Sequence, residues 1–239
     1  SEVLALASYP TYNPAEFIGG ISEYRYNELN DPAAYQPFND RAIASRYAPG
    51  STFKPFTAVA AMQRGLLSSG DVIMDNGSYE LQDCNAASGS CVFSNANNTK
   101  YGRVDLERAL VVSSDVFFYR LGEAFYEQRG VLGEAALQEG VRAFGFGRTT
   151  GIDLPGESAG LLLPVERWGP TTKAYVSFGQ GISVTPLQLA TAFAAVANGG
   201  RLLRPYVVAE IGHEGAETFT EAGGGELRYI PALNDRPDH

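Results

Sequence analysis

Histidine is almost absent from this chain of 239 residues. Both histidines, His213 and His239, lie in the C-terminal stretch that is rich in Gly, Glu and Ala. This composition argues against a Ser-His-Asp relay and against a histidine-based metal site in the core. We therefore expect no metal and no cofactor, and a nucleophilic serine in this chain needs a base of another type.

Basic clusters and long apolar runs are also missing. The chain has 18 Lys and Arg against 27 Asp and Glu, a formal net charge of -9, and no Lys/Arg cluster, which argues against nucleic acid as a partner. The longest apolar helical candidate, residues 189–197, is nine residues long, and a bilayer span needs roughly 20. The chain begins abruptly before an apolar segment, so we expect upstream sequence, including any anchor, to be missing.

Cysteine is scarce as well. Cys84 and Cys91 lie seven residues apart in a loop rich in Ser, Asn and Gly, and neither has the neighbouring His or Cys that a zinc site requires. A disulfide within the loop is favoured over two free thiols. Such a bond indicates an oxidising compartment and stabilises the loop by ~2 kcal/mol, because the ring is short.

A hydroxyl and an amine stand three residues apart in YAPGSTFKPF, residues 47–56. Positions i and i+3 share one face of a helix, so Ser51 and Lys54 can meet there. Pro55 is tolerated only in a first turn, which ties the expected helix start to Ser51. Lowering a lysine pKa from about 10.4 by ~3 units, as a base requires, costs ~4 kcal/mol, which burial can supply. The ordinary alternative for an isolated S-x-x-K is a capped helix with a solvated lysine.

Expected strands lie at both ends of the chain and expected helices in its middle. Residues 3–7 and 206–211 are short apolar segments typical of strands, whereas residues 12–47 show no sustained period. Asp105 and Thr185 predict helix starts, and Ser113 predicts a break between two helices. The fold class is therefore α+β, or mixed α/β, without the regular alternation of a doubly wound sheet. We expect one domain over residues 1–211 and a poorly ordered tail over residues 212–239.

These segments resemble the transpeptidase domain of class B, elongation-type penicillin-binding proteins, within the serine-lysine group that includes β-lactamases. The stretches that carry the resemblance follow the family's order at residues 4–14, 47–56, 113–119, 144–147, 151–156, 179–181 and 185–188. The resemblance extends over residues 2 to about 211. It implies a helical cluster packed against an antiparallel sheet, with the C-terminal strands of the family missing from this chain.

The resemblance also implies a peptidoglycan D,D-transpeptidase that works through an acyl-enzyme. Ser51 would attack the peptide carbonyl of a D-Ala-D-Ala stem, and Lys54 would accept its proton. Ser113 matches the serine of the family's second motif, which relays protons to the leaving group. Asp115 stands where many relatives carry Asn, and an ionised Asp accepts hydrogen bonds but cannot donate them.

Further expectations concern binding, partners and location. Gln180 and Gly181 are substrate-binding candidates, with a purely loop-shaping role as the alternative. The expected partners are peptidoglycan stem peptides, β-lactams that acylate the serine, and a glycosyltransferase of the wall machinery. The expected location is the extracytoplasmic face of the bacterial membrane, through an N-terminal anchor outside this chain.

The family's third motif, Lys-Thr/Ser-Gly, is absent, because none of Lys54, Lys100 and Lys173 is followed by it. We interpret residues 148–151, Arg-Thr-Thr-Gly, as a structural turn and not a substitute, and we expect the chain to stop before the motif. Losing one oxyanion donor costs ~10²–10³ in rate. Two alternatives stay open: a non-catalytic β-lactam or peptidoglycan sensor, or a remnant of one, and a β-lactamase in which water resolves the acyl-enzyme.

Overall fold

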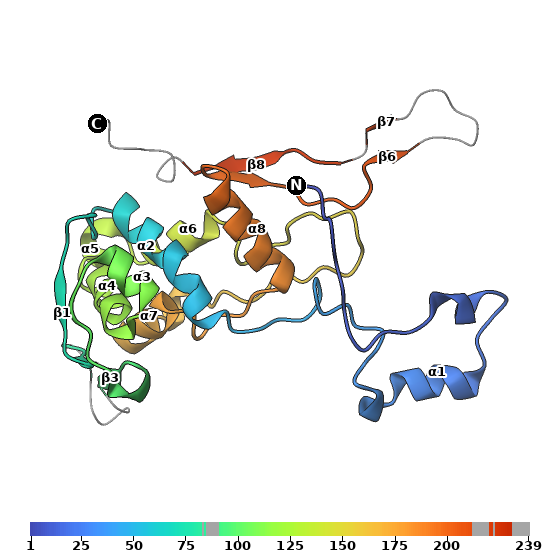
Figure 1. Cartoon of the computed structure of the whole chain (residues 1–239), viewed down its shortest axis with the longest axis horizontal. Coiled ribbons are helices and arrows are strands. Elements are labelled where there is room, and N and C mark those ends of the chain that lie inside the picture. Colours follow the sequence, from blue (N-terminus) through green and yellow to red (C-terminus); the bar gives the residue numbers. More distant parts are fainter. Residues whose placement is uncertain (83, 85–90, 212–219, 222, 231–239) are drawn as a thin grey trace.

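A computed structural model describes residues 1–82, 84, 91–211, 220–221 and 223–230 (Figure 1). The α-helices are α1 (Glu23–Asn30), α2 (Lys54–Gln63), α3 (Leu106–Val111), α4 (Asp115–Glu127), α5 (Arg129–Leu132), α6 (Ala136–Arg142), α7 (Pro170–Ser177) and α8 (Pro186–Ala197). The strands are β1 (Ile73–Asp75), β2 (Ser78–Glu80), β3 (Val92–Ser94), β4 (Gly102–Val104), β5 (Arg201–Leu203), β6 (Glu210–Ile211), β7 (Thr220–Glu221) and β8 (Glu226–Tyr229). Helices and antiparallel strand pairs confirm the predicted mixed class.

Helix α2 lies in the middle of the helical cluster and is held from several sides (Figure 1). Its Phe56 is fully buried, with ring centroids 4.9 Å from Phe144 and 5.0 Å from Phe193 of α8. Ala60 faces Gly140 of α6, where an added Cβ would lie only 2.5 Å from the Ala60 Cβ. This close approach and the aromatic packing fix the helix that begins just after Ser51.

The predicted helix starts are confirmed by their caps. The Asp105 carboxylate accepts the Arg108 N–H at the start of α3. At α8, Thr185 and Gln188 form a complete capping box. The Thr185 hydroxyl accepts the Gln188 N–H, and the Gln188 side-chain oxygen accepts the Thr185 N–H. Among the described residues, no helix is long and apolar enough to cross a bilayer.

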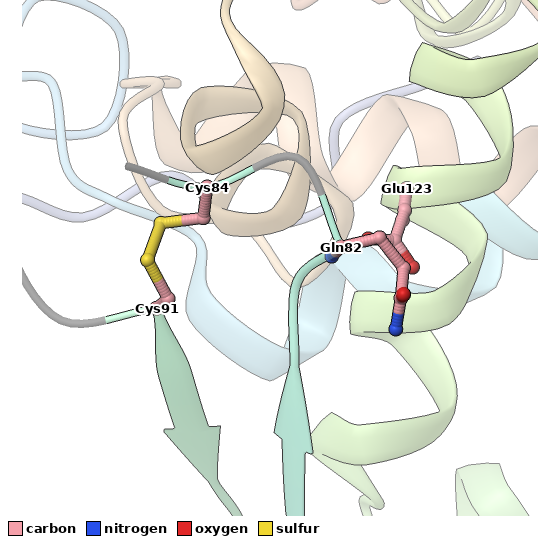
Figure 2. Close-up of a disulfide and its surroundings, with 4 residues drawn as sticks. All are labelled: Gln82, Cys84, Cys91 and Glu123. Atoms are coloured by element: carbon pink, nitrogen blue, oxygen red, sulfur yellow. A yellow bond between two sulfur atoms is a disulfide. The ribbon is translucent and has the colours of Figure 1, made fainter. Parts of the chain in front are cut away.

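Two antiparallel strand pairs form a lobe beside α4. Strand β1 pairs with β4, and β2 pairs with β3. Beyond the ends of β2 and β3, a disulfide joins Cys84 to Cys91 (Figure 2). The cross-link ties the two chain segments that leave this hairpin.

The β2–β3 hairpin is anchored to α4 by one buried carboxylate. Glu123 of α4 accepts the Gln82 N–H at 2.6 Å and also accepts the Tyr79 hydroxyl proton. Figure 2 shows Glu123 on the helix facing Gln82, with Gln82 between it and the disulfide in this view. The ring of Phe93 packs 5.3 Å from Tyr119 of α4, so apolar contact supports the polar anchor.

The prediction of a strand at residues 3–7 is wrong. Val3 N–H donates to the Tyr206 carbonyl at 2.9 Å, and Tyr206 N–H donates to the Ser1 carbonyl at 3.1 Å. This parallel bridge is isolated, because residues 4–7 have no backbone hydrogen bond within the described part of the chain. An apolar run without a neighbouring ladder stays extended without becoming a strand.

The predicted strand over residues 206–211 is shorter than expected. Only β6 within it is a strand, paired with β7. The Asp153 carboxylate accepts the N–H groups of Val207 and Val208, both at 2.8 Å. These two backbone donors are therefore not available to a strand ladder.

Within the segment expected to be a poorly ordered tail, residues 226–229 form strand β8. Strand β8 pairs antiparallel with β5, and Ile230 is buried in the main core, to which Leu202 also belongs. The Ile230 N–H donates to the Gly200 carbonyl at 2.7 Å. The pairing with β8 gives backbone groups of β5 hydrogen-bond partners. Residues 212–219, 222 and 231–239 lie outside the described residues.

The segment expected to be irregular, residues 12–47, contains α1 and short 3-10 turns. Ser22 caps α1 by accepting the Arg25 N–H at 3.2 Å. Figure 1 shows α1 standing away from the helical cluster. This arm leads back to the body of the chain immediately before Ser51.

Candidate active site

Ser51 lies in a 3-10 turn, η3 (Gly50–Phe53), that runs directly into α2. Its side chain is exposed, and the Lys54 N–H donates to its carbonyl. Gly50 enters the turn with φ +55°, a left-handed conformation that glycine adopts without steric cost. The serine hydroxyl is thus presented to solvent at the start of a buried helix.

The loop after α7 holds this turn from outside. Gly50 N–H donates to the Gly179 carbonyl at 3.1 Å. Gly179 has φ +86°, and an added Cβ would lie 2.2 Å from the Gly50 carbonyl oxygen. Upstream, Tyr47 and Val184 exchange two backbone hydrogen bonds, both 2.9 Å. Both flanks of the nucleophile candidate are therefore fixed by the segment at residues 179–184.

Lys54 is buried, with 1% of its side chain exposed, and its ammonium makes three hydrogen bonds. Nζ donates to the Asp115 Oδ1 at 2.6 Å, to the Ser113 carbonyl at 2.8 Å and to the Ser113 Oγ at 2.9 Å. Among the described residues Nζ makes no hydrogen bond to Ser51. The structure therefore brings Lys54 together with Ser113 and Asp115, and leaves Ser51 next to this group without a direct hydrogen bond to it.

Two opposing effects act on the proton of Lys54. Burial lowers the pKa of the amine, while the hydrogen bond and charge of Asp115 raise it, and burial is the larger effect. The ring of Phe118 lies 5.5 Å from Nζ and adds to the apolar surroundings. A lysine poised in this way can change between ammonium and free amine, which a base requires.

Ser113 lies at the break between α3 and α4 in a strained conformation. Its φ is +55°, which is uncommon for a residue with a side chain. Ser113 N–H donates to the Leu110 carbonyl and Ser114 N–H donates to the Ala109 carbonyl, and three residues, 112–114, separate the end of α3 from the start of α4. The left-handed turn directs both the carbonyl and the hydroxyl of Ser113 at Lys54.

Behind this break lies a buried polar group that the sequence analysis missed. Asp75, at the end of β1, is fully buried and accepts the Ser114 hydroxyl at 2.6 Å. Asn95, just after β3, donates to both Asp75 oxygens and accepts the N–H of Asp115 at 2.8 Å. No motif in the sequence relates residues 75 and 95 to residue 114, so only the fold could bring them together.

The remaining site candidates lie on the loop after α7. Gln180 is exposed, and its N–H donates to the Tyr175 carbonyl at 2.9 Å. Gly181 is also exposed and has φ +71°. Both follow Gly179 directly, so they lie beside the turn that carries Ser51.

Residues 148–151 form an irregular segment after α6 whose backbone is bonded by side chains from elsewhere. The Glu157 carboxylate accepts the N–H of Thr150 at 2.6 Å and of Gly151 at 3.1 Å. The Gln188 side chain donates to the Arg148 carbonyl at 2.7 Å. Within the described part of the chain, no group of three His, Cys, Asp or Glu side chains is arranged to hold a metal ion.

Comparisons with known proteins agree with this geometry. Residues 1–226 match the family model described as penicillin binding protein transpeptidase domain. The chain is 36% identical over 240 residues to the peptidoglycan D,D-transpeptidase MrdA of Acinetobacter baumannii. The match covers 95% of this chain and 33% of that protein. It thus spans about a third of the length of this curated relative.

Two solved structures are similar over nearly the whole chain. PBP2 of Pseudomonas aeruginosa, in complex with WCK 5153, has a TM-score of 0.80 and 31% identity, over 98% of this chain and 52% of that chain. Penicillin-binding protein A of M. tuberculosis, an imipenem acyl-enzyme complex, has a TM-score of 0.77 and 27% identity, over 97% of this chain and 52% of that chain. The chain therefore belongs to the transpeptidase domain family of the penicillin-binding proteins.

Proposed function

We propose that this chain is part of a serine-type peptidoglycan D,D-transpeptidase, in which Ser51 becomes acylated. One observation carries the proposal: an exposed serine stands one helical turn before a buried lysine whose amine is shared by Ser113 and Asp115. The M. tuberculosis relative is an imipenem acyl-enzyme, and we infer the same covalent chemistry for Ser51.

In the proposed reaction, the Ser51 Oγ attacks the carbonyl carbon between the two D-Ala residues of a stem peptide. The free amine of Lys54 accepts the Ser51 proton, and the Ser113 hydroxyl passes a proton to the nitrogen of the leaving D-Ala. The Ser51 ester forms as the peptide C–N bond breaks. The amine of a second stem then attacks the ester, which restores Ser51 and creates the cross-link.

Lys54 enters this reaction only after it loses a proton. In the resting arrangement its ammonium is held by Asp115 and Ser113, and Asp115 keeps 19% of its side chain exposed. We infer that loss of the proton releases Nζ from the carboxylate and frees it to accept from Ser51. The Ser113 hydroxyl, already 2.9 Å from Nζ, is placed to carry the proton onward.

The proposal for these residues covers acylation. No Lys-Thr-Gly or Lys-Ser-Gly occurs in the 239 residues, so the family's third motif contributes nothing from within this chain. The Ser51 N–H, in the first turn ahead of α2, is proposed as one oxyanion donor. Gln180 and Gly181, beside this turn, are proposed to border the substrate.

Location and partners are proposed with the activity. The Cys84–Cys91 disulfide favours an oxidising compartment, and this supports a location at the extracytoplasmic face of the membrane. We propose that stem peptides and β-lactams bind at Ser51, and that a glycosyltransferase of the wall machinery supplies the strands to be cross-linked.

Labelling with a fluorescent penicillin tests the proposal on the full-length protein. Wild type should be labelled covalently and Ser51→Ala should not. Ser69→Ala is the matched control, because Ser69 is an exposed serine in a Ser-x-Asp sequence away from Lys54, and it should label like wild type. Labelling of Ser51→Ala at the wild-type level would refute the assignment of the nucleophile.

The same assay separates the alternatives. A stable penicilloyl adduct on a protein that never transfers a stem to an acceptor amine would indicate a sensor. Rapid turnover of a chromogenic cephalosporin would indicate a β-lactamase. Absence of any labelling of the wild type would indicate a remnant without catalytic function.

A further inference from the structure

A buried carboxyl group outside the expected motifs lies behind the catalytic group. Asp75 has 0% exposure and receives hydrogen bonds from the Gly77 N–H at 2.8 Å, the Ser114 hydroxyl at 2.6 Å, and the Asn95 amide at 2.8 and 2.9 Å. No ion pair to Asp75 is present in the described structure. A buried acceptor group of this kind is retained only where its hydrogen bonds are made, so its three donor groups form one connected unit.

Asn95 transmits the position of this carboxyl group to the start of α4. Its Oδ1 accepts the N–H of Asp115 at 2.8 Å and of Val116 at 3.0 Å. Because backbone N–H groups only donate, these two bonds fix the side-chain amide with its nitrogen toward Asp75. Its nitrogen also donates to the Thr99 carbonyl at 2.8 Å, which uses both amide hydrogens.

Ser114 completes the arrangement from within the break. Its Oγ accepts the Phe117 N–H at 3.1 Å while donating to Asp75. The first three N–H groups of α4, those of Asp115, Val116 and Phe117, are therefore all satisfied by Asn95 and Ser114. The helix that carries Asp115 begins at a place set by the β1 and β3 lobe and not by its own sequence alone.

We propose that Asp75 and Asn95 are positioning residues of the active site, which hold Ser113 and Asp115 within hydrogen-bond distance of the Lys54 amine. The inference rests on the function proposed above. Ser113 and Asp115 flank Ser114 on the chain, so a displacement of the buried serine moves both groups that bond Nζ. The strained φ of Ser113, +55°, persists because the residues on either side are tied down.

Two variants of Asp75 separate positioning from charge. Asp75→Ala removes the acceptor for three donors and frees the start of α4. Asp75→Asn keeps one oxygen for Gly77 and Asn95, and the Ser114 hydroxyl can turn to accept from the new amide. We expect acylation by penicillin to slow by about 10-fold to 10²-fold in Asp75→Ala and to be largely restored in Asp75→Asn.

The matched control is Glu123→Ala. Glu123 is also a buried carboxyl group that joins α4 to the strand lobe, through Tyr79 and Gln82. It bonds the Gln82 end of the β2–β3 hairpin, whereas Asp115 is bonded at the opposite end, by Asn95. Its loss should lower the melting temperature in the manner of Asp75→Ala. It should leave the rate of acylation near that of wild type.

The pH profile supplies a readout that a loss of stability does not move. Asp115 is the charged group that acts on Lys54 in the described structure, and it raises the pKa of the amine. When Asp115 is displaced, the free amine forms at lower pH. The acid limb of the acylation profile should therefore move to lower pH in Asp75→Ala while the maximal rate falls, and it should stay in place in Glu123→Ala.

The experiment measures the second-order rate of labelling by a fluorescent penicillin from pH 5 to 9, with the melting temperature of each full-length variant. Absence of labelling in wild type would refute the proposed function and, with it, the positioning inference that rests on it. Wild-type labelling with equal rates and profiles in Asp75→Ala and Glu123→Ala would overturn the inference alone. If Asp75→Ala yields no folded protein, Asn95→Ala is measured in its place, with the same two outcomes.

Discussion

Replacing Asp115 with asparagine tests directly whether Lys54 is the base. The two side chains meet at 2.6 Å, with Lys54 1% and Asp115 19% exposed, so solvent screens this pair only weakly. Asparagine keeps an oxygen that can accept from Nζ and removes the negative charge. The variant therefore removes the negative charge beside Lys54 while it keeps an acceptor for the amine.

The size of the effect follows from the kind of bond that changes. A hydrogen bond to a charged group contributes about 1.5–3 kcal/mol, and one between neutral groups about 0.5–1.5 kcal/mol. The difference, about 1–1.5 kcal/mol, stabilises only the protonated amine, and about 1.4 kcal/mol corresponds to one pH unit. Because Asp115 raises the pKa of Lys54, its neutralisation should move the acid limb of the acylation profile to lower pH by about one unit.

The assay is the rate of fluorescent penicillin labelling between pH 5 and 9 on the full-length protein. Below the wild-type midpoint, Asp115→Asn should be labelled faster than wild type, by up to about tenfold. Asp71→Asn is the control, because Asp71 bonds the Ser68 N–H in an exposed turn and should leave the profile unchanged. An unmoved acid limb, or one displaced to higher pH, would refute Lys54 as the titrating group.

Three further predictions concern the frame of the site. Gly179→Ala places a Cβ 2.2 Å from the Gly50 carbonyl oxygen, so it should lower the free energy of unfolding by about 1–3 kcal/mol and slow penicillin labelling. Gly65→Ala is the control, because Gly65 has φ +69° but open space around it, and it should lower the free energy of unfolding less. Thermal unfolding of both variants tests this difference. Cys84→Ser removes the disulfide and should lower the free energy of unfolding by about 2 kcal/mol. Wild type and variant are unfolded with and without reductant, and equal stability of all four samples would contradict this prediction. Thr185→Ala removes half of the capping box and should cost about 0.5–2 kcal/mol in a urea titration, and an unchanged midpoint would argue against the cap.

What the sequence predicts well is local. The start of α8 could be read from Thr185 and Gln188, because both halves of a capping box lie within four residues. The helix start near Ser51 follows from Pro55 in the same way. In each case the residues that decide the structure are neighbours in the chain.

The partners of Lys54 are not local, and here the prediction from spacing was incomplete. Spacing by three residues suggests a contact with Ser51, yet the amine bonds Ser113 and Asp115, about 60 residues away. Helical spacing gives the face on which a side chain lies but not the tertiary partners that compete for it. The motif resemblance brought Ser113 and Asp115 into the site, whereas hydrophobic periodicity alone could not have done so.

Asp75 and Asn95 show where such reasoning ends. A carboxylate at the end of a short strand and an amide after another are ordinary turn residues by composition. Their role depends on the pairing of β1 with β4 and of β2 with β3, which carries them to the same helix start. The short strands were not expected, so the network that they support could not be either.

The packing of Ile230 has a consequence for how the chain is made. The main core includes Leu202 and Ile230, and β5 pairs with β8. On the ribosome, the helical cluster is therefore complete in sequence well before the residue that closes its core has been released. A nascent chain arrested before residue 230 exposes apolar surface around β5, so we expect this late interval of synthesis to be the one most dependent on chaperones.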